Sequence, residues 1–501
     1  MIGNPLEESH AQLQQAKGLL RERKFDQAQA ICEALLRRYP NYVGALYTLG
    51  LVYGEQDRNE HALDCLVRAL MLSPRNKPVA TALAEIYLRL GANEMAAQTL
   101  ERAAPSGPPD AAALLMLGDI YQEDCQYERA RDKYRQALAV EPDLASAAIG
   151  LGWCHGHLGD YGEAARTFAG LIERGVNLIE PVRALTILPA SAVKVDLLAQ
   201  LEKLAKPPGE DEADFANSVD FLRAAILDRR GHYAEAWECL TRANRAVFLK
   251  MHDRLGPIAE RWRDSLDMLR ANPGRRGRTD ATGHPISLFI LGASRSGKTT
   301  TEGLVATLNG VKRGYESPCL RDAILRTFQA GSLLGAAALE HLPPHLYPLC
   351  REYYVEELGR RAGSARVFTN SAFGQIYIAA LISDMLPNVR FLFVKRDVED
   401  NVFRIFMTKY RSGNAYAYDL KAAREHVVQH HEMIDLMAEK FPDIVRVVRY
   451  EDVVTDPAAA RAVAAELCGL PIPDEMAVPA VDSDRGCSAP YRERMAIVLK
   501  Q

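Results

Sequence analysis

A 34-residue period runs through the first part of the chain and restricts its possible folds more than any other feature. Alanine recurs at this interval five times, at positions 28, 62, 96, 130 and 164. Proline recurs in the same phase at positions 40, 74, 108 and 142, and tyrosine at positions 53, 87 and 121. An unbroken period of this length is typical of stacked structural repeats, in which each unit contacts its neighbours.

Each period reads as two amphipathic helices, as in "ALYTLGLVYGEQDRNEHALDCLVRALMLSP". The small Ala62 stands where the second helix would cross the first, and a proline ends the unit because it cannot continue a helix. The pattern predicts an α-superhelical array of helical hairpins, with the tyrosine series packed between helices. This region, about residues 10–176, resembles the tetratricopeptide repeat family. The resemblance implies a concave face that binds a peptide or protein partner or a second copy of the chain, and a purely scaffolding role stays open.

The phase of the repeat is lost after residue 176. Residues 177–217 read as an irregular insert that includes the polar run "KPPGEDEAD". A hairpin pattern returns around Ala236, so we predict a repeat domain over residues 1–270. The Gly-, Pro- and Arg-rich stretch that follows predicts a linker at 271–285, before a second domain over 286–501.

Composition excludes some classes of protein. The net charge is −4, which gives no general attraction to nucleic acid or to anionic membranes. No run of about 18 apolar residues predicts a membrane span, and the amino terminus lacks the pattern of a secretory leader. The nine cysteines are scattered without a CxxC pair, which favours reduced thiols in the cytoplasm.

The second domain opens with the strongest motif in the chain. The apolar run "ISLFILG" predicts a buried parallel strand, and "TTTEGLVATL" predicts a helix. Between them, Gly292, Gly297, Lys298 and Thr299 match the pattern GxxxxGK[ST]. In this context backbone N–H groups and the amino end of a helix point at a bound anion. The sequence therefore predicts a P-loop-like α/β domain with a parallel sheet that binds phosphate or sulfate.

A second predicted strand narrows the choice of anion. In "NVRFLFVKRDVEDNVFRIF", Lys395 and Arg396 precede Asp397 at the end of the apolar run. A Mg²⁺-dependent kinase or nucleotide triphosphatase needs an acidic residue at such a position. The cations favour a second phosphate instead, and the alternative of an ATP-dependent enzyme that uses Lys298, Thr299 and Mg²⁺ stays open.

Three stretches carry a more specific resemblance, "SRSGKTTTEGLVATLNGVKRGYE", "NVRFLFVKRDVEDNVFRIF" and "VRYEDVVTDPAAARAVAAELCGLP". They resemble bacterial sulfotransferases that are linked to tetratricopeptide repeats and related to tyrosylprotein sulfotransferase. The resemblance implies the sulfotransferase fold and sulfuryl transfer from 3′-phosphoadenosine 5′-phosphosulfate to a hydroxyl or phenol, with no metal. The acceptor it implies is a peptide, a protein or a small molecule.

The resemblance also implies roles for individual residues. The 5′-phosphosulfate would be bound by Ser294, Arg295, Ser296, Gly297, Lys298, Thr299 and Thr300. Glu316, nineteen residues after Gly297, would be the catalytic base, while Arg295 and Lys298 would stabilise the leaving phosphate. The remaining donor-binding candidates are Arg396 and Arg404 at the 3′-phosphate, Tyr450, and the weaker candidates Ser488 and Arg492 in a late loop over the nucleotide.

The chain departs from the family pattern at four positions. Lys298 stands where the family has Thr, Asn370 and Ser371 stand where it has Asp-Lys, and Arg404 stands where it has Ser. We expect Lys298 to restore the lost Lys charge and Arg404 to grip the 3′-phosphate more strongly. The alternative is a repeat-based adaptor whose degenerate nucleotide domain binds a ligand without turnover.

One helical pattern holds two histidines a single turn apart, His426 and His430. This spacing can hold a metal ion. No third ligand is evident in the sequence, so we predict that both histidines lie on an exposed helix face.

Overall fold

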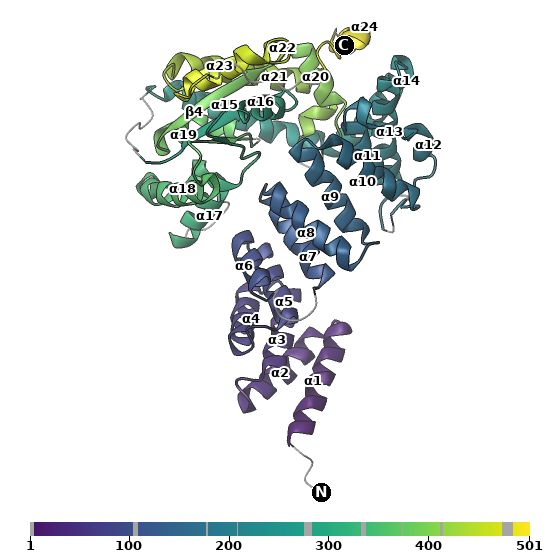
Figure 1. The fold of residues 1–501 in the computed structure, drawn as a ribbon, viewed down its shortest axis with the longest axis vertical. Helices are drawn as coiled ribbons and strands as arrows, with labels where there is room; N and C mark the ends of the chain where they lie inside the picture. Colours follow the sequence, from purple (N-terminus) through teal and green to yellow (C-terminus); the bar gives the residue numbers. More distant parts are fainter. Residues whose placement is uncertain are drawn as a thin grey trace. The chain divides into compact units, whose positions relative to one another are not determined.

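The computed structural model describes residues 5–103, 109–176, 179–207, 209–274, 283–331, 337–372, 374–410, 414–472 and 484–500. The chain forms two compact units, Met1–Val176 and Asn177–Gln501, here called unit 1 and unit 2. Figure 1 traces both in sequence colours, from the purple amino-terminal helices to the yellow carboxyl-terminal ones. The described part of unit 1 is helical, and unit 2 combines helices with a five-stranded sheet.

Unit 1 is an array of helical hairpins. Its helices are α1 (Pro5–Arg21), α2 (Phe25–Arg38), α3 (Val43–Glu55), α4 (Asn59–Leu72), α5 (Lys77–Arg89), α6 (Asn93–Ala103), α7 (Ala111–Glu123), α8 (Tyr127–Val140), α9 (Ala145–Leu158) and α10 (Tyr161–Glu173). Successive helices pack in pairs, from α1 with α2 to α9 with α10. The repeat alanines occupy the fourth position of α2, α4, α6, α8 and α10, and each is 0% exposed. Because a larger side chain there would push the paired helices apart, the 34-residue period reflects these contacts, and the predicted array is confirmed.

The tyrosine series packs between helices of the array. The hydroxyl of Tyr53 on α3 donates to Glu33 Oε1 on α2 at 3.3 Å, and that of Tyr121 on α7 donates to Glu101 Oε1 on α6 at 2.6 Å. Tyr87 is half-buried against the same apolar cluster as Tyr53. The prediction that these rings pack between helices is confirmed.

Unit 2 begins with helices α11 (Ile179–Ile187), α12 (Leu197–Leu201), α13 (Glu212–Arg229), α14 (Tyr233–Met251) and α15 (Leu255–Ala271). The prediction of an irregular insert over 177–217 is therefore wrong in part, since α11, α12 and the start of α13 lie in it. Asp196 and Asp211 accept hydrogen bonds from the first amides of α12 and α13, which stabilises both helix starts. The hairpin predicted around Ala236 is present as α13 and α14.

These helices belong to the same compact unit as the sheet. The Asn244 side chain of α14 donates to the Phe406 carbonyl at 3.0 Å, and the Tyr491 hydroxyl donates to Asp228 on α13 at 2.7 Å. The boundary between the two compact units therefore falls after residue 176. The predicted domain scheme places the boundary later, with a repeat domain over 1–270, a linker at 271–285 and a second domain over 286–501. That scheme stays a prediction. Residues 275–282 of that linker lie outside the described residues.

The sheet of unit 2 contains five parallel strands in the order β2-β3-β1-β4-β5. The strands are β1 (Ile286–Leu291), β2 (Val311–Lys312), β3 (Val367–Asn370), β4 (Val389–Lys395) and β5 (Val445–Arg449). On the central strand β1, Ile286 pairs with Val367 of β3 and Ser287 pairs with Val389 of β4. A central parallel strand is buried on both faces, which explains the continuous apolar runs that predicted β1 and β4.

Helices cover both faces of the sheet. On the face of Leu288 and Ile290 lie α16 (Lys298–Val305) and α23 (Pro457–Leu467). On the face of Phe289 and Leu291 lie α15, α17 (Cys319–Ala330), α18 (Tyr347–Ala362), α19 (Ala379–Met385) and α21 (Leu420–Lys440). The remaining α-helices are α20 (Val398–Phe406), α22 (Tyr450–Thr455) and α24 (Arg492–Lys500). The predicted α/β domain with a parallel sheet is confirmed.

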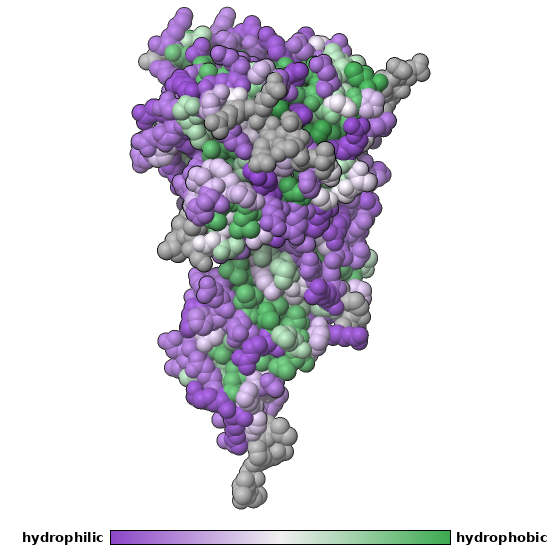
Figure 2. Space-filling model, turned by 90° about the vertical axis from the view of Figure 1, so that its left-hand side faces the viewer, coloured by the Kyte–Doolittle hydropathy of each residue, from purple (hydrophilic) through white to green (hydrophobic). Residues whose placement is uncertain are grey.

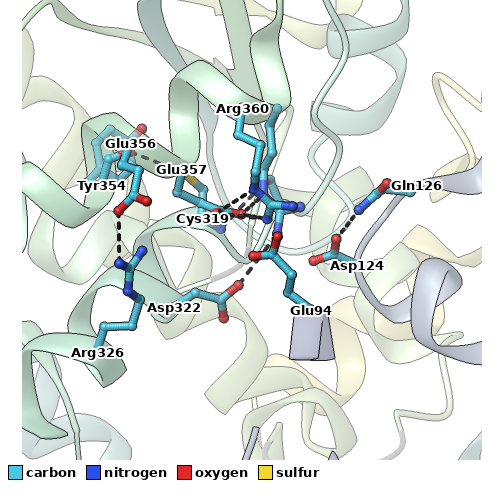
Figure 3. Close-up of polar contacts among 12 residues, drawn as sticks. Glu94, Asp124, Gln126, Cys319, Asp322, Arg326, Tyr354, Glu356, Glu357 and Arg360 are labelled. Atoms are coloured by element: carbon cyan, nitrogen blue, oxygen red, sulfur yellow. Dashed lines mark hydrogen bonds and ion pairs between the residues drawn. The ribbon is translucent and has the colours of Figure 1, made fainter. Parts of the chain in front are cut away.

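Ion pairs join α17 and α18 (Figure 3). Between the two helices, Arg326 donates to Glu356 at 2.8 Å and Arg361 lies 3.5 Å from Asp322. Within α18, Glu357 accepts from Arg360 at 2.7 Å and from Arg361. Burial would raise the pKa of Glu357, but its hydrogen bonds and the two guanidinium charges outweigh burial and lower that pKa. These pairs stiffen the helical hairpin that follows the β2 segment.

Two sequence expectations concern the whole chain. None of the described helices is long and apolar enough to cross a membrane. All nine cysteines are free, and most of them are buried.

Candidate anion-binding site

The residues between β1 and α16 form a tight loop at the carboxyl end of the central strand. Arg295 and Gly297 have positive φ angles of 60° and 98°, and Gly297 is the N-cap residue of α16. A Cβ atom on Gly297 would lie 2.2 Å from Cδ2 of Tyr450, so glycine alone fits between the loop and that ring. The predicted order of strand, glycine loop and helix is confirmed.

The loop presents hydrogen-bond donors at the amino end of α16. The first turn of a helix has amide groups without intrahelical acceptors, and these attract anions. Ser296 is 1% exposed, and its Oγ atom has no hydrogen-bond partner among the described residues. Arg295 and Thr299 are exposed, and Thr300 is half-buried. A buried hydroxyl without a partner at a helix amino end is suited to a phosphate or sulfate oxygen.

Two polar contacts fix the start of the loop. The side-chain amide of Asn401 donates to the Ser294 carbonyl at 2.7 Å, and the Ser294 Oγ atom lies 2.8 Å from the Tyr410 hydroxyl oxygen. Both partners come from the segment that follows β4. Asn401 on α20 and Tyr410 beyond that helix therefore hold the start of the loop in place.

Lys298 is turned inward from the loop. Its ammonium group donates to the Ala293 carbonyl at 3.1 Å, and the residue is 9% exposed. Burial lowers the pKa of Lys298 to about 8; the Glu316 carboxylate opposes this shift and the Arg295 charge adds to it. The ammonium thus lies within electrostatic range of both Glu316 and Arg295.

Glu316 lies on the segment that follows β2, held by the end of β3. The Ser371 amide donates to the Tyr315 carbonyl at 2.7 Å, and the Asn370 side chain donates to the Ser317 carbonyl at 3.0 Å. The Glu316 side chain reaches solvent, yet the protein around it desolvates its carboxyl group and raises its pKa. Lys298 opposes this shift, Glu302 adds to it, and Arg295 opposes it. A carboxyl group with a raised pKa beside a cationic loop is suited to general-base chemistry.

A second cluster lies at the end of β4. Arg396 is 3% exposed, donates to the Arg295 carbonyl at 3.2 Å, and stacks over the Tyr450 ring with its guanidinium carbon 4.5 Å from the centroid. Its Nε atom is buried and has no hydrogen-bond partner among the described residues. Arg396 therefore links the end of β4 to the loop after β1.

The carboxylate of Asp484 occupies the centre of this second cluster. Its Oδ1 atom lies 3.0 Å from Arg396 NH1 and accepts from the Tyr450 hydroxyl at 2.7 Å, while its Oδ2 atom lies 2.7 Å from Arg404 Nε. Burial raises the pKa of Tyr450 to about 12, and the Asp484 charge contributes to that shift. The two arginines expected at a 3′-phosphate thus share an internal carboxylate, which the sequence analysis did not anticipate.

The late-loop candidates have other partners. The backbone amide and hydroxyl of Ser488 both donate to Asp400 Oδ1, at 3.0 Å and 2.6 Å, and the residue is fully buried. Arg492 on α24 is exposed, pairs with Glu399 at 3.4 Å, and lines a surface hollow of about 540 Å³ over α20, α21 and α24. No contact of the described residues joins Arg492 to the loop after β1, so its assignment to the nucleotide site stays a prediction.

His426 and His430 are buried, so the prediction of an exposed helix face is wrong. Trp262 on α15 packs against both rings, and its indole N–H donates to His426 Nδ1 at 3.1 Å. Desolvation lowers the pKa of both histidines. Among the described residues, no group of three or more His, Cys, Asp or Glu could hold a metal ion.

Unit 1 carries a separate apolar surface. On the face that Figure 2 shows, apolar residues gather in a patch between hydrophilic borders. A hollow of about 440 Å³ lies among α5, α6, α7 and α8, and its apolar lining includes Ala80, Leu100, Ala103, Leu114, Leu117 and Val140. The described residues that line this hollow all belong to the array.

The fold and the site define a helical repeat array and an α/β domain with a candidate anion-binding loop. Residues 285–474 match the sulfotransferase family, and residues 13–74, 47–111 and 115–175 match the tetratricopeptide repeat. Together these matches correspond to a tetratricopeptide repeat array followed by a sulfotransferase family domain.

Similarity to curated proteins is partial. The chain is 26% identical over 166 residues to tetratricopeptide repeat protein 13 of Homo sapiens, and 27% identical over 173 residues to the peroxisomal targeting signal receptor of Komagataella phaffii. Each match covers 32% of this chain but only 19% and 29%, respectively, of the relative's own length.

Three solved structures illustrate the similarity to part of this chain. MamA is 21% identical, with a TM-score of 0.31 and coverage of 32% of this chain and 94% of MamA. A tetratricopeptide repeat protein from Parabacteroides merdae is 19% identical, with a TM-score of 0.36 and coverage of 47% and 92%. YrrB, described as a TPR protein with an unusual peptide-binding site, is 18% identical, with a TM-score of 0.32 and coverage of 34% and 89%.

Proposed function

We propose that this protein transfers a sulfuryl group from 3′-phosphoadenosine 5′-phosphosulfate to a hydroxyl or phenol oxygen. The match to the sulfotransferase family supports the class of reaction. One feature of the site supports an anionic donor at this position. The Ser296 hydroxyl at the amino end of α16 is buried and has no partner among the residues that the structure describes, and Arg295 and Lys298 lie beside it.

The residues of the loop suggest a direct displacement. Glu316 removes the proton from the acceptor hydroxyl as the acceptor oxygen forms a bond to sulfur. The bond between sulfur and the 5′-phosphate oxygen breaks, and that oxygen gains negative charge. Arg295, Lys298 and the first amides of α16 stabilise this charge. The products are the sulfated acceptor and 3′-phosphoadenosine 5′-phosphate, and the proton on Glu316 passes to solvent.

The nucleotide would extend from the loop toward the end of β4. There Arg396 and Arg404 would receive the 3′-phosphate, with Tyr450 packed beneath Arg396. A phosphate in this position takes over the two guanidinium groups that Asp484 contacts in the structure. Binding of the 3′-phosphate therefore exchanges one anionic partner for another.

Calorimetry of the full chain tests the donor assignment. We expect 3′-phosphoadenosine 5′-phosphate to bind without metal and in the presence of a chelator, and Arg396→Ala to weaken that binding by about 100-fold, as for removal of one partner of a buried charge pair. ATP binding that requires Mg²⁺, with no binding of the bisphosphate, would instead identify an ATP-dependent enzyme. Bisphosphate binding without turnover of any acceptor would identify an adaptor with a ligand-sensing domain.

The array suggests where an acceptor or partner binds. Tetratricopeptide repeats support a role in protein interaction, and the apolar hollow among α5, α6, α7 and α8 fits apolar side chains of a polypeptide. We therefore place a peptide or protein acceptor ahead of a small molecule. Sulfation of tyrosine-containing peptides faster than of a free phenol would support this order, and equal rates would contradict it.

A further inference from the structure

Glu302, on α16, is a fully buried carboxylate with partners from other segments. Its Oε1 atom accepts from the Thr369 hydroxyl at 2.6 Å, and its Oε2 atom accepts from the Ser371 hydroxyl at 3.1 Å. The guanidinium of Arg313 lies 3.3 Å from the same Oε2 atom. Thr369 and Ser371 come from the end of β3, and Arg313 directly follows β2. Glu302 therefore joins the loop helix to two neighbouring strand ends.

A buried carboxylate charge costs free energy unless neighbouring groups stabilise it. A buried carboxylate without partners would shift its pKa or destabilise the fold, and a leucine of similar size would avoid that cost. Glu302 stands four residues after Lys298, on the same side of the helix. The carboxylate therefore lies on a buried helix face where packing alone does not require a charge.

The partners of Glu302 are the residues that hold the Glu316 segment. Arg313 also donates to the Thr299 carbonyl at 3.3 Å and stacks over the Tyr315 ring at 4.2 Å. The Thr369 hydroxyl accepts from the Gly314 amide at 3.0 Å. Residues 313–315 thus make contacts with both α16 and β3.

The 313–315 segment is closely packed and conformationally constrained. A Cβ atom on Gly314 would lie 2.0 Å from the Thr369 carbonyl oxygen, so the two backbones touch. Tyr315 has a φ angle of 56°, a conformation that non-glycine residues adopt at a cost. The surrounding contacts hold that conformation, and the next residue along the chain is Glu316.

We propose that Glu302 is a positioning residue of the reaction, which locks the 313–315 turn against α16 and β3 so that Glu316 lies beside the loop cations. This inference rests on the proposed sulfotransferase function. The Glu302 charge has a second effect, since it contributes to the raised pKa of Glu316, together with desolvation and against Lys298 and Arg295. Arg313 is the cation that partners Glu302 itself.

The variant Glu302→Gln tests the role because it keeps the shape and removes the charge. With 3′-phosphoadenosine 5′-phosphosulfate and a phenol, we expect kcat to fall about 10- to 100-fold, as for a small misplacement of a catalytic group. The affinity for 3′-phosphoadenosine 5′-phosphate should change by less than about twofold, because Glu302 contacts Thr369, Ser371 and Arg313, none of which is assigned to the nucleotide.

The pH profile separates positioning from simple loss of structure. Glu316 acts as its carboxylate, so kcat falls as the pH drops through its pKa. Removal of the Glu302 charge lowers that pKa, and the acidic limb of the profile should move to lower pH. A limb that does not move, or an unchanged kcat, would overturn the inference. No turnover by the unaltered protein would overturn the proposed function and the inference with it.

A matched pair at Thr369 provides a second test that keeps Glu302 in place. Thr369→Ser retains the hydroxyl that bridges Glu302 and Gly314, and Thr369→Val removes it with little change of shape. We expect the Ser variant to retain turnover within about threefold and the Val variant to lose about tenfold. Equal turnover of the two variants would contradict the bridge.

Discussion

The two ends of the candidate site differ in whether their positively charged residues already have an anionic partner. At the loop after β1, Arg295 is exposed and the buried Ser296 hydroxyl has no partner among the described residues. At the end of β4, Arg396 and Arg404 already share the Asp484 carboxylate. In the proposed function, the loop after β1 is ready to accept an anion. At the end of β4, Arg396 and Arg404 must first release the Asp484 carboxylate before they bind a phosphate. We therefore expect the loop to accept any suitable anion and the β4 end to select nucleotides that carry a 3′-phosphate.

The largest expected effect is at Glu316. Glu316→Gln removes the general base and should lower kcat by about 10²- to 10⁴-fold, with little change in affinity for 3′-phosphoadenosine 5′-phosphate. Steady-state turnover and calorimetry on the same preparations check both parts. Turnover within about threefold of the unaltered protein would exclude Glu316 as the base.

The next effect is at Lys298, the charged residue on the inner side of the loop. Lys298→Thr introduces the residue of the resembling family and should lower kcat/KM by about 10- to 100-fold through loss of transition-state stabilisation. Lys298 carries its charge below its pKa of about 8. The kcat/KM of the unaltered protein should therefore fall as the pH rises through that value. If kcat/KM of the Thr variant fell to the same extent over the same pH range, a group other than Lys298 would cause the fall.

A smaller effect is expected at the β4 end. Asp484→Asn removes the carboxylate that competes with a 3′-phosphate for Arg396 and Arg404, and should raise the affinity for 3′-phosphoadenosine 5′-phosphate by about 5- to 10-fold. Adenosine 5′-phosphosulfate lacks the 3′-phosphate, so its affinity should not change. An equal gain for both nucleotides would show that Asp484 does not compete with the 3′-phosphate.

The smallest effect is expected at Ser296. Ser296→Ala should weaken nucleotide binding by a few fold, about 1 kcal/mol for one hydrogen bond. The same change should leave the melting temperature of the free protein unchanged or slightly higher, because a buried hydroxyl without a partner destabilises the fold. A lower melting temperature together with unchanged binding would mean that the hydroxyl serves the fold and not the ligand.

Local patterns predicted most of the fold. The alanine period located the second helix of each hairpin in unit 1, because the contact that each alanine makes repeats with the helix spacing. The strands β1 and β4 and the glycine loop between β1 and α16 were also predictable, because each is encoded by a short run of neighbouring residues. The insert after residue 176 was harder, since short capped helices such as α12 give little periodic signal.

The parts of the site that sequence did not reveal depend on contacts between distant residues. Asp484 reaches Arg396 across 88 residues, and Glu302 reaches Thr369 across 67. The helical spacing of His426 and His430 showed that they share a face, but not that Trp262, 164 residues from His426, covers that face. A local hint was Glu302 itself, an acidic residue one helical turn from Lys298 on a short helix.

The three tryptophans are divided between the compact units. Trp153 on α9 lies edge-on to Phe168 at 5.6 Å in unit 1, while Trp237 and the fully buried Trp262 belong to unit 2. The indole of Trp262 donates to His426, which ties its emission to the packing of α15 on α21. The tryptophan emission of a Trp153→Phe protein would therefore come from unit 2 alone. The chain thus contains its own optical probes, and the melting of the array is distinguishable from that of the sheet without any added label.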